Sequence, residues 1–410
     1  MQTNLADWIR DTPEGREADA ILRKCVHCGF CTATCPTYQL LGDELDGPRG
    51  RIYLIKQVLE GAEVTAKTQT HLDRCLTCRN CETTCPSGVK YGHLVDIGRK
   101  VVEEKVGRTV EARALRRAAA TLFPMTGAFG VATTFGRLAR PFLPAALRDK
   151  LPATVPSAGP WPAPRHARRM VALAGCVQPI LTPDTNAAAA RVLDRVGVSL
   201  VEAPGAGCCG GVRFHLDYQA EGLDDMRRVI DAWWPQVEQG VEAFAMTATG
   251  CGAIVREYGY HLQHDPRYAA KARRISELTK DLSEVLAAEG GALERFAPKG
   301  RLPKVAFHPP CSMQHWQGLA GVAEGLLARL GYPLTPVPDA HLCCGSAGTY
   351  SLTQPELSAR LKQAKLAALQ SGLPALVLTA NVGCQTHLAA GASVPVRHWI
   401  VDLDERLARP

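Results

Sequence analysis

Apolar residues along the chain follow two different patterns, one typical of helices and one typical of alternating strands and helices. Between Arg51 and Glu60, and again between Lys67 and Arg74, they recur at helical spacing. Beyond residue 168, short apolar runs of strand length alternate with longer amphipathic stretches. The first pattern predicts a mostly helical domain, and the second predicts parallel α/β sheets.

The α/β part repeats its order of elements. The first copy has predicted strands at 170–174, 198–202 and 244–248 and a helix at 186–195. The second copy has predicted strands at 304–307, 334–337 and 375–379 and a helix at 321–330. Two copies of one pattern indicate a duplicated domain.

Cysteines mark the same duplication. The first copy carries Cys176, Cys208, Cys209 and Cys251, and the second carries Cys311, Cys343, Cys344 and Cys384. Matching cysteines are 135, 135 and 133 residues apart, and 31 residues separate the first cysteine from the pair in both copies. Each follows the carboxyl end of a predicted strand, where parallel sheets place ligands. We expect metal or redox binding in at least one copy; buried, inert thiols are the alternative.

Adjacent cysteines in an extended strand would point to opposite faces. The glycines around both pairs allow the bend that brings the two thiols to one side. These glycines are Gly207, Gly210, Gly211, Gly345 and Gly348. The stretch from Gly205 to Gly210 also matches a dinucleotide-binding pattern, but the second copy keeps only its cysteines and last glycine, so we reject nucleotide binding.

Two further cysteine runs lie near the N-terminus. Cys25, Cys28, Cys31 and Cys35 are followed by Pro36, and Cys75, Cys78, Cys81 and Cys85 are followed by Pro86. This spacing is that of two-cluster ferredoxins, in which the fourth cysteine ligates the other cluster. It is not typical of zinc sites, which usually take two cysteine pairs.

We therefore predict two [4Fe–4S] clusters with crossed fourth ligands. Cluster I is expected on Cys25, Cys28, Cys31 and Cys85, and cluster II on Cys75, Cys78, Cys81 and Cys35. The eight cysteines of the repeats are candidate ligands for one or more additional clusters. No flavin site is expected on this chain.

Histidines lie near several cysteines. His27, His308 and His341 are interpreted as structural residues or as hydrogen-bond donors to cluster sulfur. His387, three residues after Cys384, is the better candidate for a ligand or proton carrier.

Positive charge is concentrated in one segment. Of the net +7, residues 106–170 contribute +9, from eleven Lys or Arg against two acids. Eight prolines fall between 106 and 168, and 152–164 is expected to be an extended linker. The segment is either a plain connector or a surface for anionic lipid, with the arginines Arg113, Arg116, Arg117 and Arg137 beside Phe and Leu. No nucleic-acid-binding fold accompanies the charge.

The first residues contain no apolar signal-peptide core, and no apolar stretch reaches 18 residues. Free thiolates suit a reducing compartment, so we expect a cytoplasmic protein, with a possible peripheral place on the inner membrane. We predict an α+β multidomain fold in four parts. These are a helical two-[4Fe–4S] ferredoxin-type domain (1–105), the basic connector (106–168), cysteine-rich repeat 1 (169–295) and cysteine-rich repeat 2 (296–410).

The whole chain resembles the family of iron–sulfur subunits of glycolate oxidase (glycolate dehydrogenase). The resemblance rests on the two cysteine runs, the Cys-Cys-Gly repeats and four segments: 49–53, 75–89, 381–388 and 397–400. The broader group includes subunits for glycerol-3-phosphate, lactate and heterodisulfide oxidoreduction. In the heterodisulfide relatives each repeat ends in Cys-x-x-Cys, whereas this chain has Ile254 and His387 there, which argues against a five-cysteine non-cubane cluster.

The resemblance implies an electron-transfer subunit without a catalytic site of its own. Flavin-binding partner subunits would oxidise glycolate to glyoxylate, and electrons would pass through the clusters to a quinone or another membrane acceptor. The alternatives are an electron-transfer subunit for lactate or glycerol-3-phosphate, and a disulfide reductase that uses its Cys-Cys-Gly sites directly.

Overall fold

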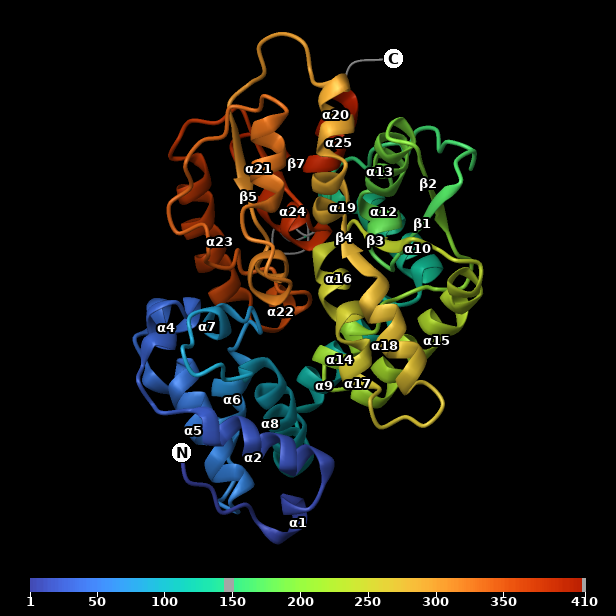
Figure 1. The fold of residues 1–410 in the computed structure, drawn as a ribbon. Coiled ribbons are helices and arrows are strands. Elements are labelled where there is room, and N and C mark those ends of the chain that lie inside the picture. Colours follow the sequence, from blue (N-terminus) through green and yellow to red (C-terminus); the bar gives the residue numbers. More distant parts are fainter. Residues whose placement is uncertain (144–150, 408–410) are drawn as a thin grey trace. The chain divides into compact units, whose positions relative to one another are not determined.

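The computed structural model describes residues 1–143 and 151–407 (Figure 1). These residues form two compact units. The first unit combines Met1–Arg117 with His341–Lys365, and the second combines Ala118–Ala340 with Leu366–Pro410. Residues 144–150 of the predicted connector and 408–410 of the predicted second repeat lie outside the described part.

The first unit is helical, and none of its described residues belongs to a strand. The helices predicted at 51–60 and 67–74 are α5 and α6. In chain order its elements are α1 (Asp7–Arg10), α2 (Pro13–Lys24), α3 (Phe30–Ala33), α4 (Pro36–Leu41), η1 (Glu44–Asp46), α5 (Pro48–Leu59), α6 (Ala66–Asp73), α7 (Asn80–Thr83) and α8 (Tyr91–Val106).

The core of this unit lies between α2, α5, α6 and α8. Leu22, Ile55, Leu59 and Leu94 are completely buried there, each contributing about 1.5–3 kcal/mol of hydrophobic stabilisation. The core supports the short helices α3 and α7, which begin inside the two cysteine runs.

A distant segment completes the first unit. Residues 341–365 contain α22 (Tyr350–Thr353) and most of α23 (Pro355–Gln370). The Asn80 side-chain amide donates to the carbonyl of His341 at 3.2 Å, and the Tyr350 hydroxyl donates to the carbonyl of Arg74 at 3.0 Å. The second Cys-Cys pair therefore begins a segment that belongs with the ferredoxin-type helices.

The first sheet of the second unit is parallel, with strand order β2-β1-β3-β4. Its strands are β1 (Arg168–Ala172), β2 (Val198–Glu202), β3 (Ala243–Met246) and β4 (Thr279–Asp281). The helices along it are α12 (Gln178–Leu181), α13 (Asp184–Arg195), α14 (Gly211–His215), α15 (Gln219–Glu238), α16 (Thr249–Arg256), α17 (Tyr258–His261), α18 (Ala269–Leu278), α19 (Leu282–Ala288), α20 (Gly290–Leu293) and η3 (Glu294–Phe296).

The second sheet has the order β5-β6-β7 and is also parallel. It contains β5 (Val305–His308), β6 (Leu376–Thr379) and β7 (Val396–His398), with η4 (Ser312–Trp316), α21 (Val322–Arg329), α24 (Val382–Ala389) and α25 (Trp399–Arg406). The predicted strand at 334–337 was wrong, because only one bridge forms there, between Val305 and Leu334. Pro336 and Pro338 have no N–H to donate and stop the ladder.

Both sheets contribute to one hydrophobic core. Buried residues of β1, β2, β5 and β6 belong to the same cluster as Trp399 of α25. Across it, Arg191 of α13 pairs with Asp404 of α25 at 2.7 Å. The predicted fold class, a helical ferredoxin-type domain followed by two α/β repeats, is confirmed.

The basic connector is largely helical before residue 143. It forms α9 (Val110–Leu122), α10 (Thr126–Leu138) and η2 (Arg140–Phe142), and α9 and α10 meet at 111° near Pro124. Residues 152–164 have no helix or strand, as predicted, although Trp161 donates to the carbonyl of Leu200 at 2.9 Å. Within the described ranges, no single helix meets the length and hydropathy of a membrane span, and only the bent pair α9–α10 meets them together.

Candidate iron–sulfur sites

The first cysteine run surrounds a cavity at the end of α2. Cys25 caps α2, and Gly29 (φ 85°) starts α3 in a left-handed conformation, so the chain turns back around the cavity. The cavity has about 440 Å³ of empty space. It is lined by Cys25, Cys28, Cys31 and Cys85, with Cys81, Arg49, Ile52 and Tyr91 among its other walls.

The second cysteine run surrounds a second cavity of about 300 Å³. Its sulfur-bearing walls are Cys35, Cys75, Cys78 and Cys81, with Thr37, Arg51, Arg79 and Tyr91 among its other walls. Thus Cys85, from the second run, lies in the first cavity, and Cys35, from the first run, lies in the second. This is the grouping that the crossed prediction requires; ligation itself stays a prediction.

Most of the thiols in these cavities are buried or half-buried, while Cys28 is exposed. Burial, together with the neighbouring Cys25, Cys28 and Cys85, raises the pKa of Cys31 to about 11. Burial likewise raises the pKa of Cys78 and of Cys81 well above the ordinary value. Four buried thiolates repel one another unless a cation lies between them, so the donor set fits a cationic iron–sulfur core.

Buried polar groups surround the second cavity. The Tyr91 hydroxyl donates to the Cys75 sulfur at 3.6 Å, and the Thr37 hydroxyl lies 3.3 Å from the Cys35 sulfur. Arg51 is about 1% exposed. Burial works to lower its pKa, but the Cys75, Tyr91, Cys35 and Asp46 groups outweigh burial, so the pKa rises and the guanidinium stays charged. Sequence reasoning did not single out these three residues, although Arg51 lies in the segment 49–53 that carried the resemblance.

The four cysteines of the first repeat lie together in the second unit. The Cys176 thiol hydrogen-bonds to Cys208, which raises the pKa of Cys176 and lowers the pKa of Cys208. Cys209 hydrogen-bonds to both Cys208 and Cys251, which raises its pKa well above the ordinary value. The predicted grouping of these four thiols at the ends of the strands is therefore present.

Backbone geometry explains how two adjacent cysteines serve one site. Gly207 (φ 66°) and Gly210 (φ 88°) flank the pair in left-handed conformations. A Cβ at Gly210 would come within 2.5 Å of the Gly222 carbonyl oxygen, so α15 packs directly on this turn. The pair is held further by Tyr258, whose hydroxyl donates to the carbonyl of Cys209 at 2.9 Å.

The cysteines of the second repeat are divided between the units. Cys343 and Cys344 belong to the first unit, and Cys311 and Cys384 to the second. Within the first unit, Cys343 lies near Cys78, whose pKa is raised first by burial and then by the charge of Cys343. The amide of Gly345, itself at φ 86°, donates to the Cys343 sulfur at 3.4 Å.

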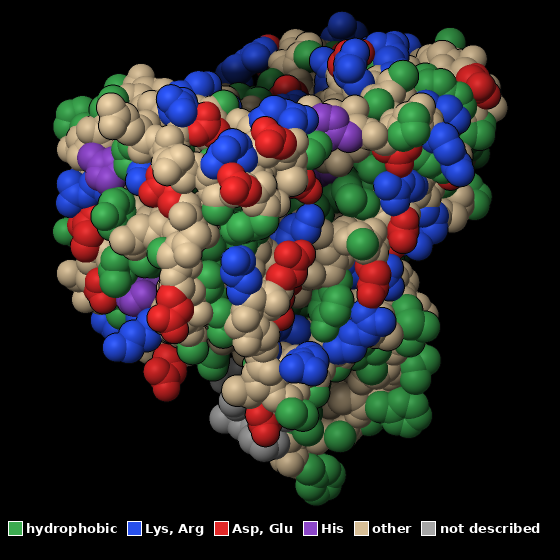
Figure 2. Space-filling model, turned by 90° about the horizontal axis from the view of Figure 1, so that it is seen from below, with side chains coloured by type: hydrophobic (Ala, Val, Ile, Leu, Met, Phe, Trp, Pro, Cys, Tyr) green, Lys and Arg blue, Asp and Glu red, His purple; other side chains and the backbone are tan. Residues whose placement is uncertain are grey.

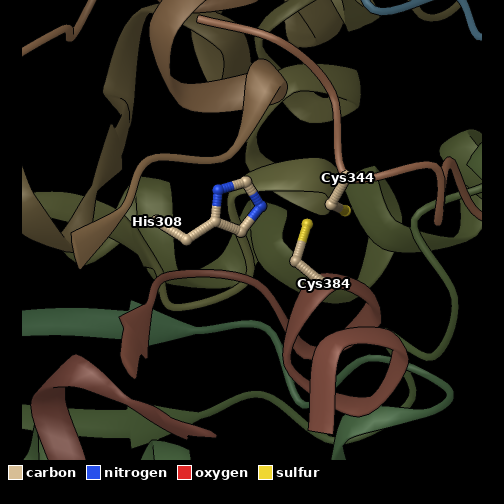
Figure 3. Close-up of side chains that lie close together, drawn as sticks. All are labelled: His308, Cys344 and Cys384. Atoms are coloured by element: carbon tan, nitrogen blue, oxygen red, sulfur yellow. The ribbon is translucent and has the colours of Figure 1, made fainter. Parts of the chain in front are cut away.

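His308 is the histidine that the structure brings to the candidate ligands of the second unit. It ends β5, is 1% exposed, and neither ring nitrogen has a hydrogen-bond partner. Its ring nitrogen and the Cys384 sulfur lie within 4.8 Å of each other, and Figure 3 draws them with Cys344. The sequence analysis favoured His387 and interpreted His308 as a structural residue or a donor to cluster sulfur; a role for either as a ligand stays a prediction. The position of His308 at the carboxyl end of a strand was the signal available in the sequence.

Comparison with known proteins matches each of these regions. Residues 21–89 match the family model of the 4Fe-4S dicluster domain, and residues 170–256 and 305–389 match that of the cysteine-rich domain. The chain is 58% identical over 409 residues to the glycolate oxidase iron–sulfur subunit of Escherichia coli K12, covering 100% of both chains.

More distant relatives follow. A probable glycolate oxidase iron–sulfur subunit of Bacillus subtilis 168 is 29% identical over 416 residues, covering 93% of this chain and 92% of the relative. Lactate utilization protein A of Bacillus velezensis is 26% identical over 210 residues, covering 51% of this chain and 85% of the relative. The two cysteine-lined cavities, the repeated Cys-Cys-Gly turns and the full-length identity together show that the chain belongs to the family of glycolate oxidase iron–sulfur subunits.

Proposed function

We propose that this chain is the electron-transfer subunit of a glycolate-oxidising complex. Flavin-binding partner subunits oxidise glycolate to glyoxylate, and this chain passes the electrons toward a quinone or another membrane acceptor. The observation that carries the proposal is the pair of cysteine-lined cavities, which share Cys81 and each hold the four predicted ligands of one cluster, in a chain 58% identical to such a subunit. Glycolate is favoured over lactate, because the lactate-related protein covers only 51% of this chain.

The proposed ligands follow the grouping of the thiols. Cluster I is held by Cys25, Cys28, Cys31 and Cys85, and cluster II by Cys75, Cys78, Cys81 and Cys35. When bound, each cluster supplies a one-electron site. Cys343, a residue of the second repeat, lies near Cys78. This proximity supports cluster II as the cluster that exchanges electrons with the second repeat.

The repeats are proposed to hold at least one further cluster. Cys176, Cys208, Cys209 and Cys251 are the favoured ligands, since their thiols are in mutual hydrogen-bond contact. Within the second unit, Cys384 and His308 are further candidate ligands. An all-cysteine donor set suits an iron–sulfur cluster.

The connector is proposed to place the complex against anionic lipid on the inner face of the membrane. Val131, Phe135, Leu138 and Phe142 recur at intervals of four, three and four residues and are 58%, 68%, 74% and 89% exposed. Val131, Phe135 and Leu138 form an apolar stripe along α10, and Phe142 of η2 follows it, beside Arg137 and Arg140. Figure 2 shows exposed hydrophobic side chains interspersed with charged ones on the face seen from below.

One predicted lipid contact is corrected by the structure. Arg116 is 8% exposed and pairs with Asp73 at 3.2 Å, so it cannot reach a membrane surface. Arg113 and Arg117 are exposed and Arg137 is half-buried. The proposed membrane contact therefore rests on the apolar stripe first and on the remaining arginines second.

The crossed ligation is tested by comparing the EPR spectra of single Cys→Ser variants. We expect Cys35→Ser to give the same change in the EPR spectrum of the reduced protein as Cys78→Ser, because both would remove a ligand of cluster II. Cys85→Ser should instead match Cys28→Ser. A spectrum of Cys35→Ser that matches Cys28→Ser would show that the fourth ligand is not crossed.

The first-repeat cluster is tested in the full-length chain. The double variant Cys208→Ser, Cys209→Ser should lose about four iron atoms per chain with the matching sulfide. The N-terminal EPR signals serve as the internal control and should persist. Iron and sulfide equal to those of the wild type would mean that these thiols are metal-free.

The electron-delivery role is tested with the partner subunits. Glycolate should reduce their flavin in a single turnover without this chain, because substrate chemistry resides on the flavin partner. Reduction of a quinone analogue should require this chain. Flavin that stays oxidised until this chain is added would assign it a part in the chemistry instead.

The lipid contact is tested with vesicles that contain anionic lipid. The double variant Phe135→Ser, Leu138→Ser should weaken binding at least about tenfold, since each side chain contributes on the order of 1.5–3 kcal/mol when buried. Added salt should weaken binding further by screening the arginines. Leu373→Ser, at a residue 83% exposed elsewhere in the second unit, is the matched control. If the double variant binds vesicles as well as the wild type but no longer binds the partner subunits, the stripe is a protein interface instead.

A further inference from the structure

Helix α5 places one arginine beside each cavity of the first unit. Arg49 lines the first cavity and Arg51 lines the second. The side chain of Arg49 is 37% exposed and pairs with Glu44 at 2.6 Å. The side chain of Arg51 is 1% exposed. The two cavities therefore differ in how strongly a fixed positive charge acts on them, because burial removes the screening that water provides.

The contacts of Arg51 fix its guanidinium next to the sulfurs. Its Nη1 donates to the Thr37 hydroxyl at 3.1 Å, and that hydroxyl lies 3.3 Å from the Cys35 sulfur. Its Nε donates to the carbonyl of His71 at 2.7 Å. These bonds hold the charged group at one place on the cavity wall.

The nearby acid does not neutralise the positive charge. Asp46 is 3.4 Å from Arg51, but it also pairs with Arg74 at 2.8 Å and with His71 at 3.0 Å. Its single negative charge is thus shared between two guanidinium groups. Two more arginines lie nearby: Arg79 lines the cavity, is 5% exposed and lies 3.7 Å from Glu82, and Arg99 donates to the carbonyl of Cys75 at 2.7 Å. The surroundings of the second cavity carry an excess of positive charge.

We propose that Arg51 raises the reduction potential of the cluster held by Cys35, Cys75, Cys78 and Cys81. Reduction adds one electron and one negative charge to the cluster, and a fixed, buried cation stabilises that added charge. The electron comes from a reduced flavin of the partner, and Arg51 neither gains nor loses a proton. The inference rests on the proposed function in one respect, namely that a cluster is bound by these four cysteines.

The consequence is a direction for electron transfer inside the first unit. Cluster II is then the cluster that is reduced first, and it is the cluster that lies near Cys343. Arg51 is thus a tuning residue that acts on the cofactor through its charge. Its neighbour Arg49, paired and partly exposed, exerts no comparable effect on cluster I.

The test is an anaerobic redox titration of the full-length chain, followed by EPR and carried out without partner subunits. Arg51→Gln should shift the reduction equilibrium of cluster II toward the oxidised form by about tenfold, a fall of about 59 mV for one electron. The potential of cluster I should stay in place. Arg51→Lys keeps the positive charge, so it should change the potential of cluster II by only a fraction of that shift. Arg49→Gln, the matched control from the same helix, should leave the potentials of both clusters unchanged.

A change of the opposite sign gives an independent check. Asp46→Asn removes the negative charge that offsets Arg51, so it should raise the potential of cluster II. If Arg51→Gln loses the cluster, the Asp46→Asn titration decides the question. Potentials of cluster II that are unchanged in Asp46→Asn, or in a loaded Arg51→Gln, overturn the inference. A wild-type chain that holds no cluster overturns the proposed function instead.

Discussion

The repulsion between thiolates crowded into a water-poor space is the interaction on which this structure depends. Most sulfurs of the two N-terminal groups are buried or half-buried, with Cys28 exposed, and burial raises the pKa of Cys31 and Cys81. Thiolates so close together repel one another, and a cationic core between the sulfurs, with donors or cations around them, relieves that repulsion. The left-handed turns at Gly29 and Gly210, the Tyr91 hydroxyl and the buried Arg51 all serve that one requirement.

Much of this could be read from the sequence, because ligand spacing and strand periodicity are local properties. The intervals within the cysteine runs predicted both four-thiol groups, and the Cys-Cys-Gly repeat predicted the grouping around Cys208 and Cys209. Helices α5 and α6 and most strands of the two sheets followed from apolar spacing. The failed strand at 334–337 has a local cause too, since its prolines should have counted against a ladder.

The rest depends on contacts between residues far apart in the chain, which periodicity does not encode. Nothing near Cys343 indicates that residues 341–365 join the ferredoxin-type unit, because the contacts that hold them run to Asn80 and Arg74. In the same way, the sequence presents Arg51 only as one charged residue in an amphipathic helix. The fold brings Asp46, Thr37 and Cys35 next to it. Burial of Arg116 against Asp73 likewise removed a residue that charge counting had assigned to the surface.

The two cysteine runs began as near-copies, 50 residues apart, and the structure gives them different surroundings. Val26 and Phe30 in the first run are 67% and 61% exposed, whereas their counterparts Leu76 and Asn80 in the second are 7% and 2% exposed. The second run is enclosed because Asn80 and Arg74 receive the segment 341–365. The first run is therefore open to contact with another protein, whereas the second run is covered by a segment of its own unit. Two runs with the same ligand spacing thus differ in access, and this difference comes from a contact that the spacing does not encode.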